Sequence, residues 1–230
     1  MRTPTAGRPR IEDRRRPGAT AGEEVLDAAA ELFTTRGYAA TSTRQIAEAV
    51  GIRQASLYHY FRTKDDILEA LLSDTVTRPL AAWALLGERP DPPEVRLHAL
   101  ALLDSRQLWE SAWNVGILYL LPEVRTERFA RFHRERDDLR ERYRQLAREV
   151  LAGLPQPTDD VLVADPVDDD VVFRLTETLP NLRADGLGRT DEPLRTADLG
   201  LHALGWRGDR TRLRSASLAA VAEVSARLGA

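Results

Sequence analysis

The sequence predicts an all-α protein, and three observations support that fold class. Apolar side chains recur at three- and four-residue spacing from residue 20 onward, as they do on the buried faces of helices. Capping patterns, glycines and prolines separate these segments. No segment shows the strict alternation of apolar and polar residues that a half-buried strand requires. The 230 residues, 43% hydrophobic and 30% charged, have the composition of a globular protein.

The N-terminal end is basic and the rest of the chain is acidic. Residues 1–65 contain 11 basic and 8 acidic side chains, whereas residues 66–230 contain 22 and 28. Such asymmetry indicates a nucleic-acid-binding end on a body that does not bind nucleic acid.

Residues 1–19 are predicted to form a flexible basic arm. They hold almost no large apolar side chain, so they cannot bury enough surface to fold alone. The arm either enters a DNA minor groove or lies along phosphates, or it is a tail without a binding role. Its arginines are Arg2, Arg8, Arg10, Arg14, Arg15 and Arg16.

The first predicted helix begins at Thr20. The Thr20 hydroxyl can accept from the Glu23 amide while the Glu23 carboxylate reaches back to the amide of residue 20, which is a capping box. An apolar stripe follows, and the helix is expected to stop at Gly37. The stripe consists of Leu26, Ala29, Leu32 and Phe33.

Two short helices follow, one from the start signal at residues 42–45 to Gly51 and one over residues 53–61. Two short helices joined by a tight turn are the ingredients of a helix-turn-helix. The second helix of such a unit enters the major groove, and its first residues read base edges. Here those residues are Gln54, Ala55 and Ser56.

The rest of the chain also has helical periodicity. A capping box at residues 63–66 opens a long helix that reaches about residue 86. Residues 94–121 are expected to form two helices that meet near Asp104 and Ser105. The remaining predicted elements are a helix over 122–151, an acidic linker over 155–166, and helices over 167–184, 193–206 and 209–228.

Several function classes are excluded by what the sequence lacks. It has no cysteine, and its four histidines lie in separate segments without a catalytic or phosphate-binding motif. His133, Glu135 and Asp137 are residue types that bind metals, but their spacing places them on different sides of a helix. We therefore expect no enzyme activity, no catalytic residue, no metal and no cofactor.

A membrane partner is not expected either. The longest nearly uninterrupted apolar run, residues 115–121, is far shorter than the roughly 20 residues of a membrane span. The N-terminus lacks the apolar core of a secretory signal, so we expect a cytoplasmic protein.

At residues 43–64 the sequence resembles the tetracycline-repressor-like (TetR) regulators. The residues that carry the resemblance are Thr43-Arg44-Gln45-Ile46-Ala47, Gly51-Ile52, Leu57-Tyr58-His59-Tyr60-Phe61 and Lys64. The resemblance covers about residues 20–68. It implies a helix-turn-helix DNA-binding domain at 20–65 and a helical ligand-binding and dimerisation domain at 66–230. It also implies a homodimer on a palindromic double-stranded DNA operator, where a small-molecule effector relieves repression.

Nine DNA-contacting residues follow from the resemblance. They are Thr43 and Arg44 on the positioning helix, Gln54, Ala55 and Ser56 as base readers, Tyr58 and His59 as groove-facing aromatic residues, Lys64 as a phosphate contact, and Arg53. Arg53 departs from the family, which usually has a capping Ser at this position. The missing cap is expected to cost about 0.5 to 2 kcal/mol, and Arg53 can instead contact a phosphate or a base.

An effector pocket for a largely apolar ligand is predicted between the later helices. Three of its residues, Trp109, Trp113 and Ile117, are expected on one helical face that Trp83 meets from the preceding helix. An aromatic-lined cavity between helices is the usual form of a small-molecule site. The alternative is that this stripe is ordinary core. The seven predicted residues are Trp83, His98, Asp104, Trp109, Trp113, Asn114 and Ile117.

The dimer interface is expected on residues 167–184 and 193–206, with a stripe at Val172, Leu175, Leu179 and Leu182. The helix over 209–228 covers this bundle or packs on its own subunit.

Two other functions remain open for the whole protein. One is a ligand-independent architectural DNA-binding protein, and the other is a transcriptional activator.

Overall fold

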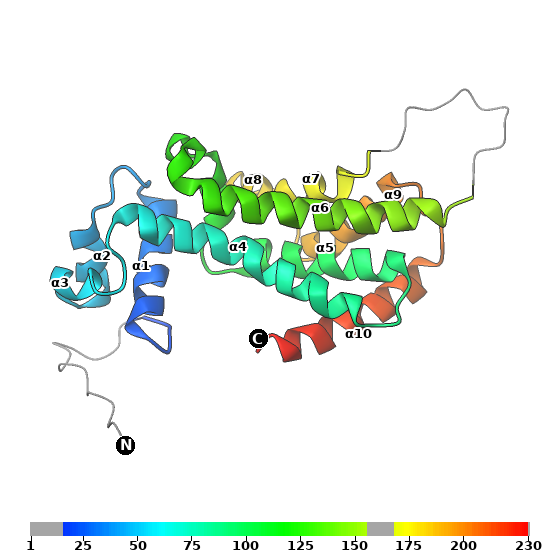
Figure 1. The fold of residues 1–230 in the computed structure, drawn as a ribbon, viewed down its shortest axis with the longest axis horizontal. Helices are drawn as coiled ribbons and strands as arrows, with labels where there is room; N and C mark the ends of the chain where they lie inside the picture. The colour runs from blue at the N-terminus through cyan, green and yellow to red at the C-terminus, as the bar shows by residue number, and fades with distance from the viewer. Residues whose placement is uncertain (1–15, 156–167, 230) are drawn as a thin grey trace, which may run out of the picture. The chain divides into compact units, whose positions relative to one another are not determined.

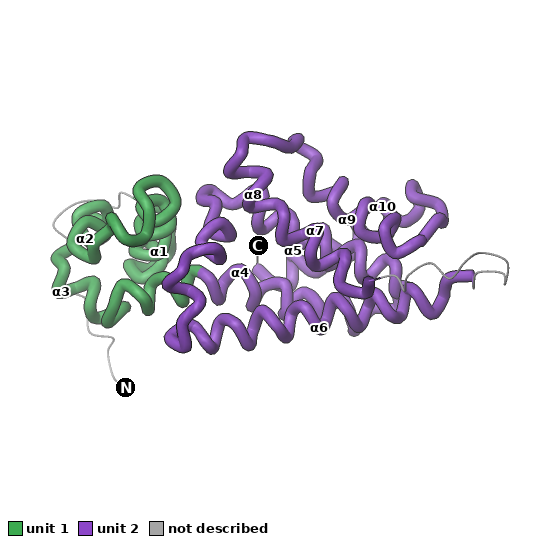
Figure 2. The backbone as a smooth tube through the Cα atoms, turned by 90° about the horizontal axis from the view of Figure 1, so that it is seen from above, with its two compact units in different colours: residues 1–71 green, residues 72–230 purple. Residues whose placement is uncertain are grey.

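The computed structural model describes residues 16–155 and 168–229, and all regular structure within them is helical. The chain forms two compact units, residues 1–71 and 72–230 (Figure 2). Their boundary falls inside one continuous helix, α4 (Lys64–Gly87). The predicted arm, apart from residues 16–19, and nearly all of the predicted linker lie outside the described residues.

Unit 1 contains α1 (Ala21–Thr35), α2 (Thr43–Val50), α3 (Gln54–Leu57) and the start of α4. The predicted capping box at Thr20 is present, and the predicted start signal at Ser42 is also a capping box. The box predicted at the start of α4 is present too, since the side chains of Thr63 and Asp66 each accept from the other's amide, at 3.0 and 2.9 Å. Gly51 ends α2 with φ of 78°, the left-handed conformation that favours glycine. The core of the unit includes Val25, Ala29, Phe33, Ile46, Val50, Leu57 and Leu68.

The third helix is shorter than predicted. It covers Gln54–Leu57, whereas the pattern had indicated residues 53–61. Beyond Leu57, the amides of His59 and Tyr60 donate to carbonyl oxygens only three residues back, at 3.2 and 2.9 Å. These bonds tighten the chain into turns, so the aromatic residues after Leu57 do not continue the α-helix.

Arg16 belongs to the folded unit rather than to a flexible arm, which corrects the prediction. Its guanidinium contacts the carboxylates of Asp27 at 2.9 Å and Glu31 at 2.5 Å. It also donates to the backbone oxygen of Ala49 at 3.3 Å. With only 16% of its side chain exposed, Arg16 joins α1 to the end of α2.

In unit 2 the central element is α5 (Pro93–Glu110), which packs against five other helices (Figure 1). This position explains why α5 is buried on nearly every side. The surrounding helices are α6 (Ala130–Ala152), α7 (Val171–Glu177), α8 (Leu179–Ala184), α9 (Glu192–Ala203) and α10 (Arg210–Arg227).

The expected break near Asp104 and Ser105 is absent, because α5 continues through both residues to Glu110. After α5 the chain forms three short 3₁₀ helices, so the α-helix expected from residue 122 begins only at Ala130. They are η1 (Val115–Leu120), η2 (Pro122–Arg125) and η3 (Glu127–Phe129).

The end of α5 is held by Arg183 of α8. The Arg183 guanidinium donates to the backbone oxygens of Leu108 at 3.1 Å, Ser111 at 2.6 Å and Ala112 at 3.2 Å. Carbonyl groups at a helix end lack partners within the helix, and Arg183 supplies them from a distant part of the sequence. The backbone leaves the helical conformation at Ser111, with ψ of 147°, and Arg183 bonds to the carbonyl groups there.

The single helix predicted over 167–184 is two helices, α7 and α8, which meet at Thr178. Pro180 lies in the first turn of α8, where its missing N–H costs least. In the predicted dimer stripe, Val172 and Leu179 are buried within their own unit, while Leu175 and Leu182 are half-buried.

The last helix matches the prediction, with the Asp209 carboxylate capping the amides of Thr211 and Arg212. Its residues Leu213 and Val221 are buried within the same unit, so this part of α10 packs on its own subunit.

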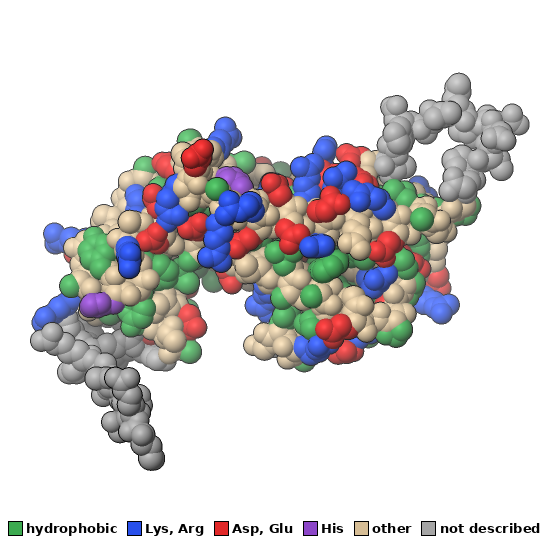
Figure 3. Space-filling model, in the orientation of Figure 1, with side chains coloured by type: hydrophobic (Ala, Val, Ile, Leu, Met, Phe, Trp, Pro, Cys, Tyr) green, Lys and Arg blue, Asp and Glu red, His purple; other side chains and the backbone are tan. Residues whose placement is uncertain are grey.

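Ion pairs join α6 to the start of α7. Arg144 and Arg148 both contact Asp169, at 2.9 and 2.6 Å, and Arg140 contacts Asp170 at 2.5 Å. Figure 3 shows the resulting mixture of positive and negative side chains on this face of unit 2. These side chains are largely satisfied by one another, so the surface is not a basic patch for nucleic acid.

Candidate nucleic-acid interface

Three of the predicted DNA-contacting residues form a hydrogen-bonded triangle on the surface of unit 1. The amide nitrogen Nε2 of Gln54 lies 3.0 Å from Thr43 Oγ1 and 3.2 Å from the Tyr58 hydroxyl. The two hydroxyl oxygens are themselves 3.2 Å apart. Tyr58 is 45% exposed, so this triangle joins the start of α2 to α3 on an accessible face.

Arg44 lies beside this triangle in the first turn of α2. Its side chain is 77% exposed and its Nε contacts Glu48 at 2.8 Å. The hydrogen bond to Glu48 raises the pKa of Arg44. Glu48 was not identified from the sequence as part of the site, although its i,i+4 spacing from Arg44 is the signal for such a pair. A phosphate or a guanine would compete with Glu48 for this guanidinium.

The other recognition-helix residues are mostly open to solvent. Arg53, Ala55 and His59 are exposed, while Ser56 is half-buried. As predicted, the side chain of Arg53 makes no capping hydrogen bond at the start of α3. Within the described part of the chain the Arg53 guanidinium has no side-chain partner, so this cation is available to an external anion.

Lys64 differs from the expected simple phosphate contact. Its ammonium nitrogen donates to the backbone oxygens of Tyr38 at 2.8 Å and Thr41 at 2.9 Å. It also stands 4.1 Å from the centre of the Tyr38 ring. Two of its three N–H groups therefore hold the turn between α1 and α2, and one remains for an outside partner.

The predicted pocket residues of unit 2 lie in different surroundings. Trp83 lies under the Arg142 guanidinium, 4.5 Å from ring centre to Cζ. His98 is fully buried between Ser217, at 2.7 Å from Nδ1, and Asp198, at 3.1 Å from Nε2. This chain joins α5, α9 and α10, and burial lowers the pKa of His98.

Asp104 lies on the side of α5 that contacts α6. It is buried and accepts a hydrogen bond from the Tyr143 hydroxyl at 2.9 Å. Burial raises the pKa of Asp104 to about 7, although the bond from Tyr143 acts in the other direction. Glu177, which pairs with Arg136, also has a pKa raised by burial. Asp104 therefore binds a proton near neutral pH.

Of the remaining four pocket residues, Trp109 lies in the last turn of α5 and the other three follow the end of this helix. Trp109 packs against Gly188, where an added Cβ would come within 2.6 Å of the indole ring. Asn114 donates to the backbone oxygen of Pro180 at 2.8 Å. Trp113 and Ile117 are half-buried beyond the helix end, so the expected common helical face with Trp109 does not exist. The structure does not bring the seven residues together around one cavity.

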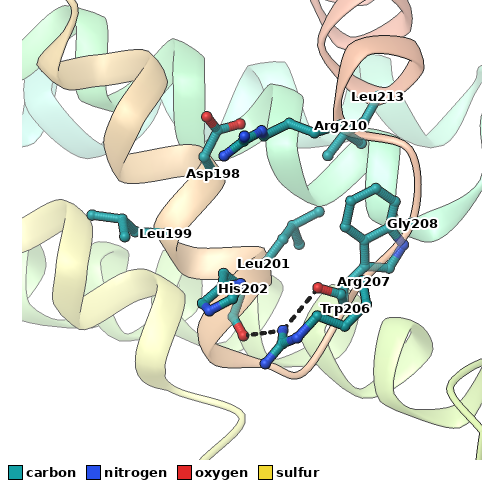
Figure 4. A pocket seen from close by; sticks show the side chains of 9 residues that line it. All are labelled: Asp198, Leu199, Leu201, His202, Trp206, Arg207, Gly208, Arg210 and Leu213. Atoms are coloured by element: carbon teal, nitrogen blue, oxygen red, sulfur yellow. Dashed lines mark hydrogen bonds between the residues drawn. The ribbon is translucent and has the colours of Figure 1, made fainter.

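A groove of about 420 Å³ lies elsewhere in unit 2, between α9 and α10. Figure 4 shows Asp198 and Arg210 on one side of it, His202 and Arg207 on the other, and Leu201 between them. The Arg207 guanidinium donates to the backbone oxygens of His202 and Trp206, at 2.8 and 2.9 Å. None of the seven predicted pocket residues lines this groove.

Residues 16–155 and 168–229 contain neither a cluster of metal-binding side chains nor a membrane-spanning helix. No group of three or more His, Asp or Glu side chains in these ranges is arranged to hold a metal ion. Across the same residues, none of the helices combines the length and the apolar character needed to cross a membrane.

Comparison with known proteins identifies the family. A family model described as "Bacterial regulatory proteins, tetR family" matches residues 25–71. The whole chain is similar to AmtR of Mycobacterium smegmatis, with 49% identity over 94% of this chain and 98% of that chain, and a TM-score of 0.80. The chain belongs to the TetR family. It is therefore a helix-turn-helix transcriptional regulator and not an enzyme, and the all-helical fold predicted from its sequence is confirmed.

Other TetR-family similarities are more limited. The HTH-type transcriptional repressor KstR2 of Mycolicibacterium smegmatis is 43% identical over 56 residues, which is 24% of this chain and 27% of that protein. The chain thus spans about a quarter of the length of this curated relative. The structure of AibR in complex with isovaleryl coenzyme A and operator DNA is similar over 80% of this chain and 97% of that chain, with 20% identity and a TM-score of 0.58. That similarity shows the fold alone.

Proposed function

We propose that this TetR-family regulator is a repressor that binds a palindromic operator as a homodimer and leaves it when a small, largely apolar ligand binds. The observation that carries the DNA-binding part is the exposed triangle of Thr43, Gln54 and Tyr58 at the start of α3. The neighbouring cations Arg44 and Arg53 supply charge for phosphates. Residues 20–65 then bind DNA, and residues 66–230 bind the ligand and the second subunit.

The proposed dimer face combines α7, α8 and α9. Leu199 of α9 is 48% exposed, and Leu175 and Leu182 are half-buried on α7 and α8. Apolar side chains of this kind on neighbouring helices are what a symmetric helical interface buries. Two recognition helices in the dimer would face successive major grooves about 34 to 36 Å apart.

Ligand release is proposed to act through α4, because this helix belongs to both units. A ligand that prefers one conformation of unit 2 shifts the population toward it and changes the spacing of the two recognition helices. AibR, which shares the fold, was crystallised with isovaleryl coenzyme A and operator DNA, and this supports a small-molecule effector. The half-buried Trp113 and Ile117, beyond the end of α5, are the proposed apolar contacts.

Two other functions predict different behaviour. An activator would bind the same operator but raise transcription from it. An architectural protein would bind DNA with the salt dependence of phosphate contacts but would show little base preference. The KstR2 relative is named a repressor, which favours repression over activation.

The test is selection of bound duplexes from a randomised pool by the purified full chain at about 150 mM salt. We expect one enriched palindrome. Arg44→Ala should weaken its binding by at least about fivefold and lower the slope of log K against log salt by about one. Arg227→Ala is the matched control, because Arg227 is also an exposed arginine paired with a glutamate, Glu88, at 2.8 Å. An unenriched pool would contradict the proposal.

A further inference from the structure

The three contacts of the triangle fix which end of the Gln54 amide faces the protein. Gln54 has an NH₂ group with two hydrogens and a carbonyl oxygen with none, and each hydroxyl has one hydrogen. Three contacts of 3.0 to 3.2 Å among three polar groups need three hydrogens. With Nε2 in the triangle, the amide supplies two hydrogens and either hydroxyl supplies the third.

The opposite orientation of the Gln54 amide supplies too few hydrogens for the three contacts. With Oε1 in the triangle, only the hydrogens of Thr43 and Tyr58 are available, so two contacts are hydrogen bonds and the third places two lone pairs together. The hydrogen-bond network is the proper criterion for assigning an amide orientation. It therefore places both amide hydrogens of Gln54 inside the triangle.

What remains for DNA is the carbonyl oxygen. Gln54 is exposed, and within the described chain its Oε1 has no partner. In the major groove an acceptor pairs with the exocyclic amine of adenine or cytosine, while guanine and thymine present acceptors there. A free glutamine amide would instead pair with N6 and N7 of adenine together.

We propose that Gln54 reads the operator as a hydrogen-bond acceptor only, so that one position of each half-site accepts A·T and C·G equally and rejects T·A and G·C. This inference rests on the proposed function. Thr43 and Tyr58 act as positioning residues, because they determine which bases Gln54 distinguishes. One of the two hydroxyl hydrogens stays free for a phosphate oxygen.

The first test uses the selected operator. Comparison of the wild-type selection with that of Gln54→Ala identifies the position whose preference depends on Gln54. Four duplexes that differ only at that pair are then titrated. We expect A·T and C·G in one orientation to bind within about threefold of each other and the two reversed pairs to bind at least about fivefold more weakly. Preference for a single pair, for both purines, or for both A·T orientations would overturn the proposal.

The second test removes the two hydroxyl groups that hold the Gln54 amide. Thr43→Val with Tyr58→Phe removes both acceptors of the triangle, so Gln54 can bond to both N6 and N7 of adenine. We expect A·T to become favoured over C·G by at least about fivefold. The matched control is Thr35→Val with Tyr60→Phe, which changes the same residue types outside the triangle and should keep the wild-type preference.

Circular dichroism melting confirms that each variant is folded. If the double variant does not fold, Tyr58→Phe alone frees one amide hydrogen and should shift the preference in the same direction. Unchanged equality of A·T and C·G in a folded variant would overturn the inference.

The two proposals fail in different ways. If selection with the wild-type protein enriches no DNA sequence, both the proposed function and this inference are wrong. If an operator is enriched but Gln54→Ala does not change its base preferences, the proposed function stands and only the inference is wrong.

Discussion

Tyr38 holds the ammonium nitrogen of Lys64 twice, through its backbone oxygen at 2.8 Å and through its ring face at 4.1 Å. The family resemblance assigns Lys64 to a DNA phosphate. The geometry adds a structural role, because the same nitrogen also donates to the backbone oxygen of Thr41. Lys64 thus joins the first turn of α4 to the turn that precedes α2.

Lys64→Met is expected to lower the free energy of unfolding by about 2 kcal/mol, because hydrogen bonds from a charged group and a cation–π contact are lost. Chemical denaturation measures this change. The matched control is Arg62→Met, which removes an exposed cation two residues earlier and should change stability by less than about 0.5 kcal/mol. Equal effects of the two substitutions would contradict the structural role. The salt slope of DNA binding by folded Lys64→Met reports the phosphate contact separately.

Arg183→Leu is expected to destabilise the fold by about 2 to 4 kcal/mol, because the backbone oxygens at the end of α5 lose a charged donor. Urea denaturation measures the loss. Arg189→Leu makes the same substitution at an exposed site in the next turn and serves as control. If the two variants unfold at the same urea concentration, Arg183 does not hold α5.

Asp104 gives the fold a predictable pH dependence. Its pKa is about 7 when folded and near 4 when unfolded, so the folded state binds more protons between these values. Stability from this group is present below about pH 4 and is lost as the pH rises toward 7. Asp104→Asn keeps the acceptor for Tyr143 and removes the ionisation.

We therefore expect Asp104→Asn to be more stable than the wild type by about 2 to 4 kcal/mol at pH 8 and to show a flatter pH profile between pH 4 and 7. Urea unfolding at fixed protein concentration across this range gives the profile. Asp185→Asn, at an exposed aspartate, should follow the wild type. Parallel profiles for Asp104→Asn and the wild type would show that Asp104 does not titrate in this window.

Leu199→Asp tests the proposed dimer face. A charge at this half-exposed leucine should convert the dimer to monomers in sedimentation measurements, because a carboxylate is costly in an apolar interface. Leu218→Asp on α10, where the leucine is 39% exposed, should leave the dimer intact. A dimer that survives Leu199→Asp but not Leu218→Asp would move the interface to α10.

Local sequence patterns predicted the starts of α1, α2 and α4 well, because each has its own capping residues. The capping boxes at Thr20 and Ser42 depend on residues three positions apart, and Gly51 ends α2 through its own backbone conformation. Such information lies within one turn of helix. The start and end of α10 were predicted for the same reason.

Contacts between distant residues were not predicted. Arg183 bonds to the end of α5 from 72 positions away along the chain, counted from Ser111, and Arg16 joins α1 to the end of α2. The apolar run after Glu110 has helical spacing, and no residue nearby in the sequence indicates the contact with Arg183. Three of the predicted pocket residues, Trp113, Asn114 and Ile117, lie in that run, so they do not share the helical face expected with Trp109.

The DNA-contacting residues were named individually by resemblance, but their mutual contacts were not. Thr43 and Gln54 meet because α2 packs against α3, which is tertiary information. Glu48 beside Arg44 was within reach of the i,i+4 rule.

Site-specific binding by a homodimer is tested most directly by a hydroxyl-radical footprint of the wild-type protein on its selected duplex. We predict two protected patches on one face of the DNA, related by the palindrome, with half-site centres about 10 to 10.5 base pairs apart or a multiple of that spacing. Protection spread evenly along the duplex, or a single patch without a symmetric partner, would contradict site-specific binding by a homodimer.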